Sequence, residues 1–266
     1  MDLVAPDFWR GIILTTLFVA IALWENAQPE WRATAPTGRR WSSNLTLYVL
    51  CTVIAIAVAP LRAIAFDIVP SVRLLPVLQN GSAVAVHFAA ALLILDLAYY
   101  LGHRLLHGWT PLWRLHAVHH TDLDLDITTT LRHHPAEVLF FTAVVAAIGA
   151  LIGITPGEAL AYGMVAFGVQ LLAHANVALP GQLTSILGAL IVTPAFHRLH
   201  HSRDQRECHA NFGEVFSFWD RLFGTAATAE GHSAIAFGVD HYLAPRHQRL
   251  GWMLLQPFVP GSSRSP

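Results

Sequence analysis

Histidine is the residue type in this sequence with the clearest chemical potential, because it makes up 16 of the 266 residues. Eight of the histidines fall into three short motifs, H-x-x-x-H once and H-x-x-H-H twice. In chain order they are His103 and His107, then His116, His119 and His120, and then His197, His200 and His201. Residues three and four apart share one face of an α-helix, so each motif would present its imidazoles together. The spacing predicts three helical groups of metal ligands.

The number of imidazoles predicts two metal ions rather than one. Neutral imidazole binds iron, copper and zinc well, and one ion takes about four to six ligands. Eight candidate ligands exceed that number. His174, in the motif LLAHANV near the end of an apolar run, could be a ninth ligand, and the sequence leaves this open. His134, in the motif LRHHPAE, is interpreted as a residue that contacts a ligand or faces the substrate.

A carboxylate interrupts the apolar run that precedes the first motif. Asp96 lies seven residues before His103, which places both on the same helical face. An acidic side chain within a membrane-spanning run is costly unless it has a partner. We interpret Asp96 as an acceptor for the outer N–H of a metal-ligating imidazole, an arrangement that fixes the tautomer of the ligand. Asn176 is a second candidate for orienting ligands or water.

The composition places these histidines in a membrane protein. Hydrophobic residues make up 54% of the chain, charged residues make up 12%, and the mean hydropathy is +0.48. The charged fraction is about half of that in an ordinary globular domain. A formal net charge of -1 shows no basic excess, which argues against a nucleic-acid partner. Two cysteines, Cys51 and Cys208, are too few for a disulfide framework or an iron–sulfur cluster.

Five apolar runs approach the length that crosses a bilayer, about 17 to 25 residues. They lie near residues 8–25, 45–65, 82–102, 138–154 and 158–179, of which the first is marginal and the fourth is short. We therefore expect an all-α integral membrane protein with four to five transmembrane or interfacial helices. Arginines concentrate in the loops 26–44 and 103–137 and after residue 180. The positive-inside rule then places the histidine motifs in a helical cap on the cytoplasmic side.

Three parts are predicted along the chain. Residues 1–81 would form membrane anchor helices, and the first run is expected to be retained because no small-residue cleavage site follows it. Residues 82–225 would form the catalytic domain, and residues 226–266 the C-terminal tail.

The three motifs, in this order and with apolar pairs of runs between them, resemble those of the fatty acid hydroxylase or sterol desaturase superfamily of membrane non-haem di-iron enzymes. Further matches are HHTDLDLDITTTLRHHPAE, similar to an acidic-threonine segment that ends in R-x-H-P-x-E; HAN, similar to H-x-N; and HHSRDQRECHANFGEVFSFWDRLFGT, similar to a tail of the type HHS…N-Y-G…S-x-W-D-x-L-F-G-T. The resemblance runs from about Asp96 to Thr225 and implies that Asn211 lies beside the ligands. His209 and Phe212 depart from it, because the family usually has Asp and Tyr there.

The resemblance implies two iron ions held by histidine, activation of O2, and hydroxylation or desaturation of an aliphatic C–H bond in a lipid such as a fatty acyl chain or a sterol. Iron suits this chemistry, whereas zinc is redox-inert. A carotenoid or other isoprenoid-lipid hydroxylase is an alternative on the same scaffold. A divalent-metal transporter is an alternative of another class, and it would hold its ligands near the bilayer midplane.

Electrons for such a reaction would have to come from another protein. The sequence holds no cysteine-rich redox motif and no G-x-G-x-x-G motif, so we expect an external ferredoxin- or cytochrome-type donor to bind the cap. Arg198, Arg203 and Arg206 could receive an acidic donor or could serve only to set the topology. The lipid substrate would enter from the bilayer. We expect a bacterial inner-membrane protein whose active site faces the cytoplasm.

Overall fold

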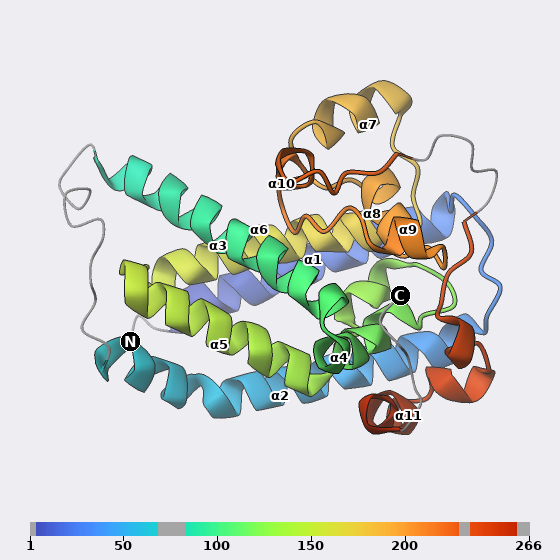
Figure 1. The fold of residues 1–266 in the computed structure, drawn as a ribbon, viewed down its shortest axis with the longest axis horizontal. Helices are drawn as coiled ribbons and strands as arrows, with labels where there is room; N and C mark the ends of the chain where they lie inside the picture. The colour runs from blue at the N-terminus through green and yellow to red at the C-terminus, as the bar shows by residue number, and fades with distance from the viewer. Residues whose placement is uncertain (1–3, 69–82, 229–234, 260–266) are drawn as a thin grey trace.

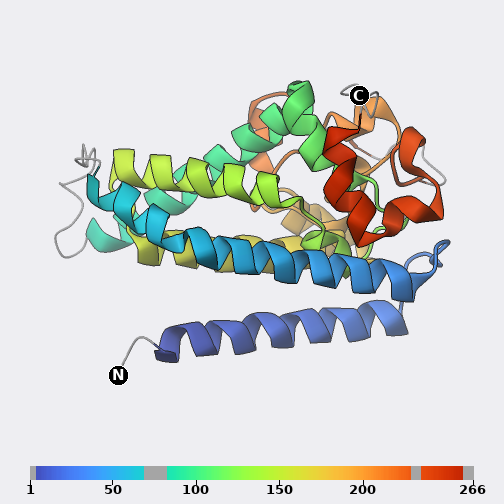
Figure 2. The same ribbon diagram turned by 90° about the horizontal axis from the view of Figure 1, so that it is seen from below.

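The computed structural model describes residues 4–68, 83–228 and 235–259, and the regular elements within these ranges are all helical. The five long helices are α1 (Val4–Ala27), α2 (Thr37–Ile68), α3 (Ala83–Gly108), α5 (Pro135–Ile152) and α6 (Pro156–His174). The short α-helices are α4 (Thr110–His120), α7 (Gly181–Gly188), α8 (Pro194–His200), α9 (Gln205–Cys208), α10 (Phe218–Leu222) and α11 (Leu250–Leu255). The 3-10 helices are η2 (Ile127–Leu131), η3 (Asp240–Tyr242), η4 (Pro245–Gln248) and η5 (Gln256–Phe258). The long helices run lengthwise, and the short ones gather towards one end of the bundle (Figures 1 and 2).

Four of the long helices are long and apolar enough to cross a membrane. The segments concerned are Trp9–Ala27, Thr37–Pro60, Ala85–Gly108 and Pro135–Ile152. Large apolar side chains on them, such as Ile13, Val53 and Leu151, face outwards. A helix satisfies its own backbone hydrogen bonds, so it can present such a surface to lipid without an unpaired polar group. The predicted all-α membrane fold with four to five spanning or interfacial helices is confirmed.

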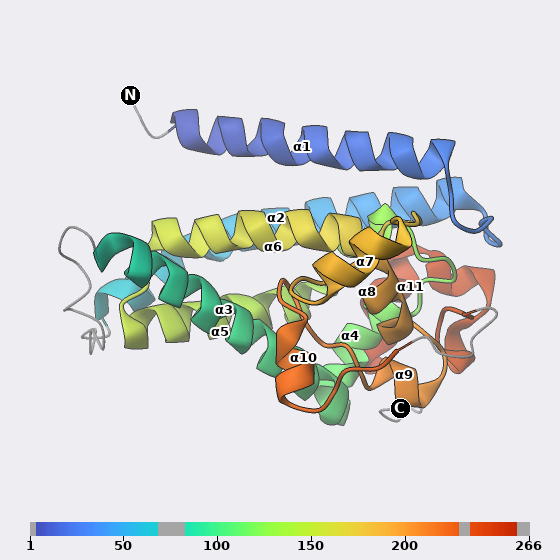
Figure 3. The same ribbon diagram turned by 90° about the horizontal axis from the view of Figure 1, so that it is seen from above.

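The fifth apolar run forms α6, which is not one of these four segments but packs against α1, α3 and α8. A capping box between Thr155 and Glu158 begins the helix. Tyr162, Ala166 and Leu171 are buried along it. The backbone turns to an extended conformation directly after His174, so α6 ends with this imidazole at the crowded end of the bundle (Figure 3).

Prolines begin the helices that carry or border the histidine motifs. Pro111 lies in the first turn of α4, Pro194 begins α8, and Pro135 begins α5. Proline is favoured in a first helical turn because the N–H that it lacks would have no helical partner there. The short helix α4 therefore starts immediately after α3, and its three histidines stay next to those at the end of α3.

Candidate metal centre

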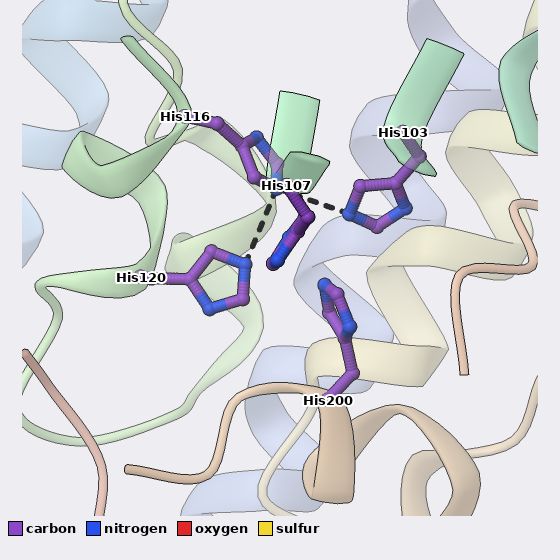
Figure 4. Close-up of side chains that lie close together, drawn as sticks. All are labelled: His103, His107, His116, His120 and His200. Carbon is purple, nitrogen blue, oxygen red and sulfur yellow. Dashed lines mark hydrogen bonds between the residues drawn. The ribbon is translucent and has the colours of Figure 1, made fainter. Parts of the chain in front are cut away.

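Five histidines form the first of two buried groups, here called group one. Its members are His103 and His107 from α3, His116 and His120 from α4, and His200 from α8. Each histidine contributes one ring nitrogen as a potential ligand atom, and these five nitrogens all lie within 4.8 Å of one another. Figure 4 shows the five rings directed towards a common centre. All five side chains are buried, so the ring nitrogens meet one another and not water.

Four histidines form group two, and they come from α4, α6 and the end of α8. The members are His119, His174, His197 and His201, again with ligand nitrogens within 4.8 Å of one another. The Nε2 atom of His174 lies 3.1 Å from Nε2 of His119 and 3.0 Å from Nε2 of His197. The structure thus brings together all nine histidines that the sequence suggested as ligands, including His174.

The two H-x-x-H-H motifs divide between the groups in opposite ways. In α4, His116 and His120 face group one, whereas His119 faces group two. In the motif of α8, His197 and His201 face group two, and the residue between them in the motif, His200, faces group one. Positions i and i+4 lie one above the other on a helix, and position i+3 is rotated away from them. Each motif therefore supplies both groups.

The groups are in direct contact with each other. The rings of His120 and His201 stack with centroids 4.5 Å apart and planes 17° apart. The ring centroids of His119 and His201 are 4.6 Å apart. Two adjoining sites of five and four imidazoles could hold two metal ions side by side.

Backbone carbonyl groups orient several imidazoles. The Nδ1 atom of His103 lies 3.0 Å from the carbonyl oxygen of Phe212, and Nδ1 of His200 lies 2.8 Å from that of Ala210. In group two, Nδ1 of His174 lies 2.9 Å from the carbonyl oxygen of Gln170. A carbonyl oxygen only accepts, so each of these Nδ1 atoms carries the proton and each Nε2 keeps its lone pair. This is the tautomer that a metal-binding imidazole requires.

The converging lone pairs fit a metal ion better than an internal hydrogen-bond network. In group one, Nε2 of His103 and Nε2 of His116 are 3.0 Å apart, although both rings direct Nδ1 towards an oxygen acceptor. Two lone pairs at this distance repel each other unless a cation lies beside them. Nε2 of His200 is buried without a hydrogen-bond partner among the described residues. A buried polar atom of this kind is costly unless it is a ligand.

Burial keeps these imidazoles neutral. Loss of solvation lowers the pKa of His200 to about 3, with the neighbouring imidazoles adding to the effect. The pKa values of His119, His120, His197 and His201 are lowered by the same causes. Neutral imidazole is the form that binds metal, so the lone pairs are available at neutral pH.

Glu137 orients the imidazole of His116, a role that the sequence did not predict. Its Oε1 atom accepts hydrogen bonds from Nδ1 of His116, at 2.8 Å, and from Nδ1 of His133, at 3.0 Å. The residue is buried in the first turn of α5. It is the final residue of the quoted R-x-H-P-x-E segment, and that was the available signal.

Replacing Glu137 with Gln is expected to weaken metal binding by about 10- to 100-fold, because it removes the charged acceptor that orients His116. The measurement is metal retained per chain after dialysis against a graded series of chelator concentrations. Glu158→Gln, in the first turn of α6 and thus at the far end of that helix from His174, is the matched control and should retain metal like the unmodified protein. Equal retention by both variants would contradict the role given to Glu137.

Asp96 does not have the partner expected from the sequence. It accepts no hydrogen bond from an imidazole among the described residues. Its four donors are the Tyr162 hydroxyl, the backbone N–H groups of Val215 and Phe216, and Nε1 of Trp219, at 2.9–3.1 Å. Asp96 therefore attaches the segment before α10 to the middle of α3. These donors lie far from it in the sequence, and spacing could not reveal them.

His134, Asn176 and Asn211, which were expected beside the ligands, form hydrogen bonds to other parts of the chain. His134 caps α5 by accepting from the backbone N–H of Ala136, and its other ring nitrogen contacts the carbonyl of Leu254. Asn176 bonds to the backbone of Trp31, and Asn211 bonds to the carbonyls of Phe196 and Ala227. Within the described part of the chain, none of the three forms a hydrogen bond with a member of either group. They shape the chain around the site instead.

The first two helices contact the loops that carry the ligands. In α1, Oε2 of Glu25 accepts from the backbone N–H groups of Ile127 and Asn176, at 3.0 and 2.8 Å. In α2, the buried Arg40 pairs with Asp122 and Asp126, which directly follow α4. The N-terminal helices therefore brace the site in addition to any anchoring.

The two positions that depart from the family pattern lie at group one. The ring of Phe212 packs 5.2 Å from that of His107 and 5.5 Å from that of His200. The ring of His209 lies 5.6 Å from that of His107. Nearby, burial raises the pKa of the Cys208 thiol to about 12.

The fold and the site define a class of protein: an all-α membrane protein with two adjoining, buried groups of imidazoles suited to metal. The family model for fatty acid hydroxylase matches residues 88–225, just over half of the sequence, and the chain belongs to this family.

Known proteins in several kingdoms are similar to this chain. The ornithine lipid hydroxylase OlsE of Rhizobium tropici is 28% identical over 87% of this chain and 71% of its own length. An alkylglycerol monooxygenase of Caenorhabditis elegans is 32% identical over 49% of this chain and 25% of its own length. A very-long-chain aldehyde decarbonylase of Oryza sativa is 31% identical over 59% of this chain and 26% of its own length. No solved structure matches the chain significantly.

Proposed function

We propose that this chain is a membrane-bound di-iron monooxygenase that uses O2 and external electrons to hydroxylate an aliphatic C–H bond of a lipid. The observation that carries the proposal is the contact between group one and group two, since two adjoining imidazole sites suit a pair of iron ions. Family membership supports it, as do two of the similar proteins, which are a lipid hydroxylase and a monooxygenase.

The reaction is balanced when R–H, O2, two electrons and two protons give R–OH and water. Two bound iron ions would supply the redox chemistry, which no side chain of the site can provide. Nine histidines would hold them: His103, His107, His116, His119, His120, His174, His197, His200 and His201. The carbonyls of Phe212, Ala210 and Gln170, together with Glu137, hold the rings in the required orientation. Burial of the ligands keeps bulk water out of the site.

Metal transport is the weaker candidate. A transporter would hold its ion near the bilayer midplane on interrupted helices. Here the ligands come from the last turns of α3 and α6 and from short helices outside the four candidate spans. The ligand rings are buried and packed against one another, which suits a resident metal site better than a transport pathway.

The proposal includes lateral entry of the lipid from an inner membrane and an electron donor that binds the cap on the cytoplasmic side. Two of the three arginines considered for that donor have partners within the chain. Arg198 pairs with Glu30 and lies over the ring of Trp31, and Arg203 pairs with Asp240. Arg206 is exposed. Donor binding would therefore depend on Arg206 more than on the other two.

The test combines metal analysis with lipid analysis. Protein purified without oxygen and reconstituted with iron should contain about two irons per chain and give the Mössbauer spectrum of a coupled pair. Both should be lost in the double variant His119→Ala, His200→Ala. Cells that express the unmodified protein should accumulate a lipid heavier by one oxygen atom, absent with the double variant. Zinc alone, or metal that survives the double substitution, would overturn the proposal.

A further inference from the structure

Glu214 is an interior acidic residue that the interactions described above leave unused. Asp96 accepts four hydrogen bonds and Glu137 accepts two. The Glu214 carboxyl group makes no hydrogen bond and no ion pair with any residue that the structure describes. Its side chain is partly accessible. A carboxyl group that is partly accessible and makes no hydrogen bond within the protein can form one with a bound ligand.

The position of Glu214 is close to both groups of imidazoles. Nε2 of Gln170 donates to its backbone carbonyl at 2.5 Å, and the carbonyl of Gln170 accepts from Nδ1 of His174. Glu214 therefore lies beside α6 about one turn before a group-two ligand. Its neighbours in the sequence contact α3 and group one, because the backbone N–H groups of Val215 and Phe216 donate to Asp96, and the carbonyl of Phe212 accepts from Nδ1 of His103.

His133 is a second partly accessible polar residue beside the ligands. It stacks on His119 with centroids 4.5 Å apart and planes 14° apart, and its Nδ1 donates to Glu137. Unlike the buried ligands, it keeps 34% of its side-chain surface accessible. Two partly accessible polar side chains, those of His133 and Glu214, thus lie near the buried ligands.

A purely hydrocarbon segment of substrate would be poorly matched to the Glu214 carboxyl group. Placing an alkyl chain against an unpaired carboxyl group removes water from it and supplies no hydrogen bond, which costs free energy. We infer that the substrate carries a hydrogen-bonding group, a hydroxyl, amide or amine, within a few bonds of the carbon that is oxidised, and that Glu214 binds this group. The inference rests on the proposed function and deepens it: oxidation would occur near the polar end of the lipid.

The chemistry of Glu214 agrees with such a partner. Burial, together with the nearby charge of Asp96, raises the pKa of Glu214 to about 8. At neutral pH the group is then mostly a carboxylic acid, which can both donate to and accept from a hydroxyl group. A site built to bind a hydroxyl group rejects an analogue that lacks it, because the bound analogue covers the acid and leaves it unpaired.

The test measures binding of two radiolabelled probes to the purified full chain: 1-O-hexadecylglycerol, and its 2,3-di-O-methyl ether, which has no hydroxyl group. The unmodified protein should bind the first probe at least about tenfold more tightly. Glu214→Leu, which removes the hydrogen bonds at similar volume, should bind the two probes almost equally. Glu214→Gln can still donate and accept, and should restore most of the discrimination. Glu158→Leu, at the far end of α6, should discriminate like the unmodified protein.

Metal content is measured on the same samples. Equal binding of both probes by the unmodified protein, or full discrimination by Glu214→Leu, would overturn the inference. So would loss of metal from both Glu214 variants, which would make the residue part of the metal centre. Discrimination that depends on Glu214 in a protein that oxidises no lipid would support the polar site and overturn only the proposed reaction.

Discussion

His200→Ala and His197→Ala, made separately, are each expected to reduce bound iron from about two to about one per chain. The two residues lie three positions apart on α8 but belong to different groups, so the pair tests the division of one motif between two sites. Lipid oxidation should fall about 1000-fold or more in each variant, because residues that act as a unit lose most of the function singly. Iron is counted by mass spectrometry and by Mössbauer spectroscopy.

His241→Ala is the control for this pair, since His241 is exposed and belongs to neither group. It should keep both irons and full activity. The division into two sites also predicts that each single variant keeps a mononuclear iron signal. Retention of two coupled irons in either His197→Ala or His200→Ala would contradict the assignment of that residue as a ligand.

The helices were predictable because apolar runs of bilayer length leave few alternatives. Each of the five runs forms one long helix, and the run at 158–179 ends as α6 at His174. The four segments that could span a membrane follow from length and composition alone. The histidines were predictable for a similar reason, since spacings of three and four residues bring imidazoles together on a helix.

The allocation of those histidines to two sites could not be predicted. It depends on how α4 and α8 are rotated relative to each other, which the spacing within each helix does not specify. His119 and His200 occupy the same position within their identical motifs, yet His119 faces group two and His200 faces group one. Only the packed structure sets the direction of each face.

The residues that orient the ligands were the least predictable part of the site. Three imidazoles donate to backbone carbonyls, and every residue has a carbonyl, so no residue type marks the position. Asp96 was conspicuous in the sequence as a charge in an apolar run, but it bonds to a segment about 120 residues away. The contact of α2 with the site was equally hidden, because Arg40 and its partners are more than 80 residues apart.

Arg40→Met is expected to lower the free energy of unfolding strongly, because it removes this contact between α2 and the site. The Arg40 guanidinium is buried and pairs with Asp122, Asp126 and the carbonyl of Asp124. Removing one partner of a buried ion pair costs about 3–5 kcal/mol, because the remaining charges are left without compensation. For a protein of this size we expect the melting temperature in detergent to fall by about 10 °C. Arg39→Met, at the exposed neighbouring position, should have almost no effect.

The acid dependence of stability gives the same interaction a second test. The charges of Arg40 and Arg132 overcome the effect of burial and lower the pKa of Asp122 from its ordinary 3.8 to about 2. A carboxylate with a lowered pKa stabilises the fold fully above the ordinary value and loses that contribution as the pH falls towards the lowered one. Asp122 therefore contributes fully at pH 7, and its share should disappear between about pH 4 and pH 2. Asp122→Asn should remove this part of the acid dependence, and combining it with Arg40→Met should recover some of the lost stability. An Arg40→Met variant that melts like Arg39→Met would show that α2 does not brace the ligand loop through this arginine.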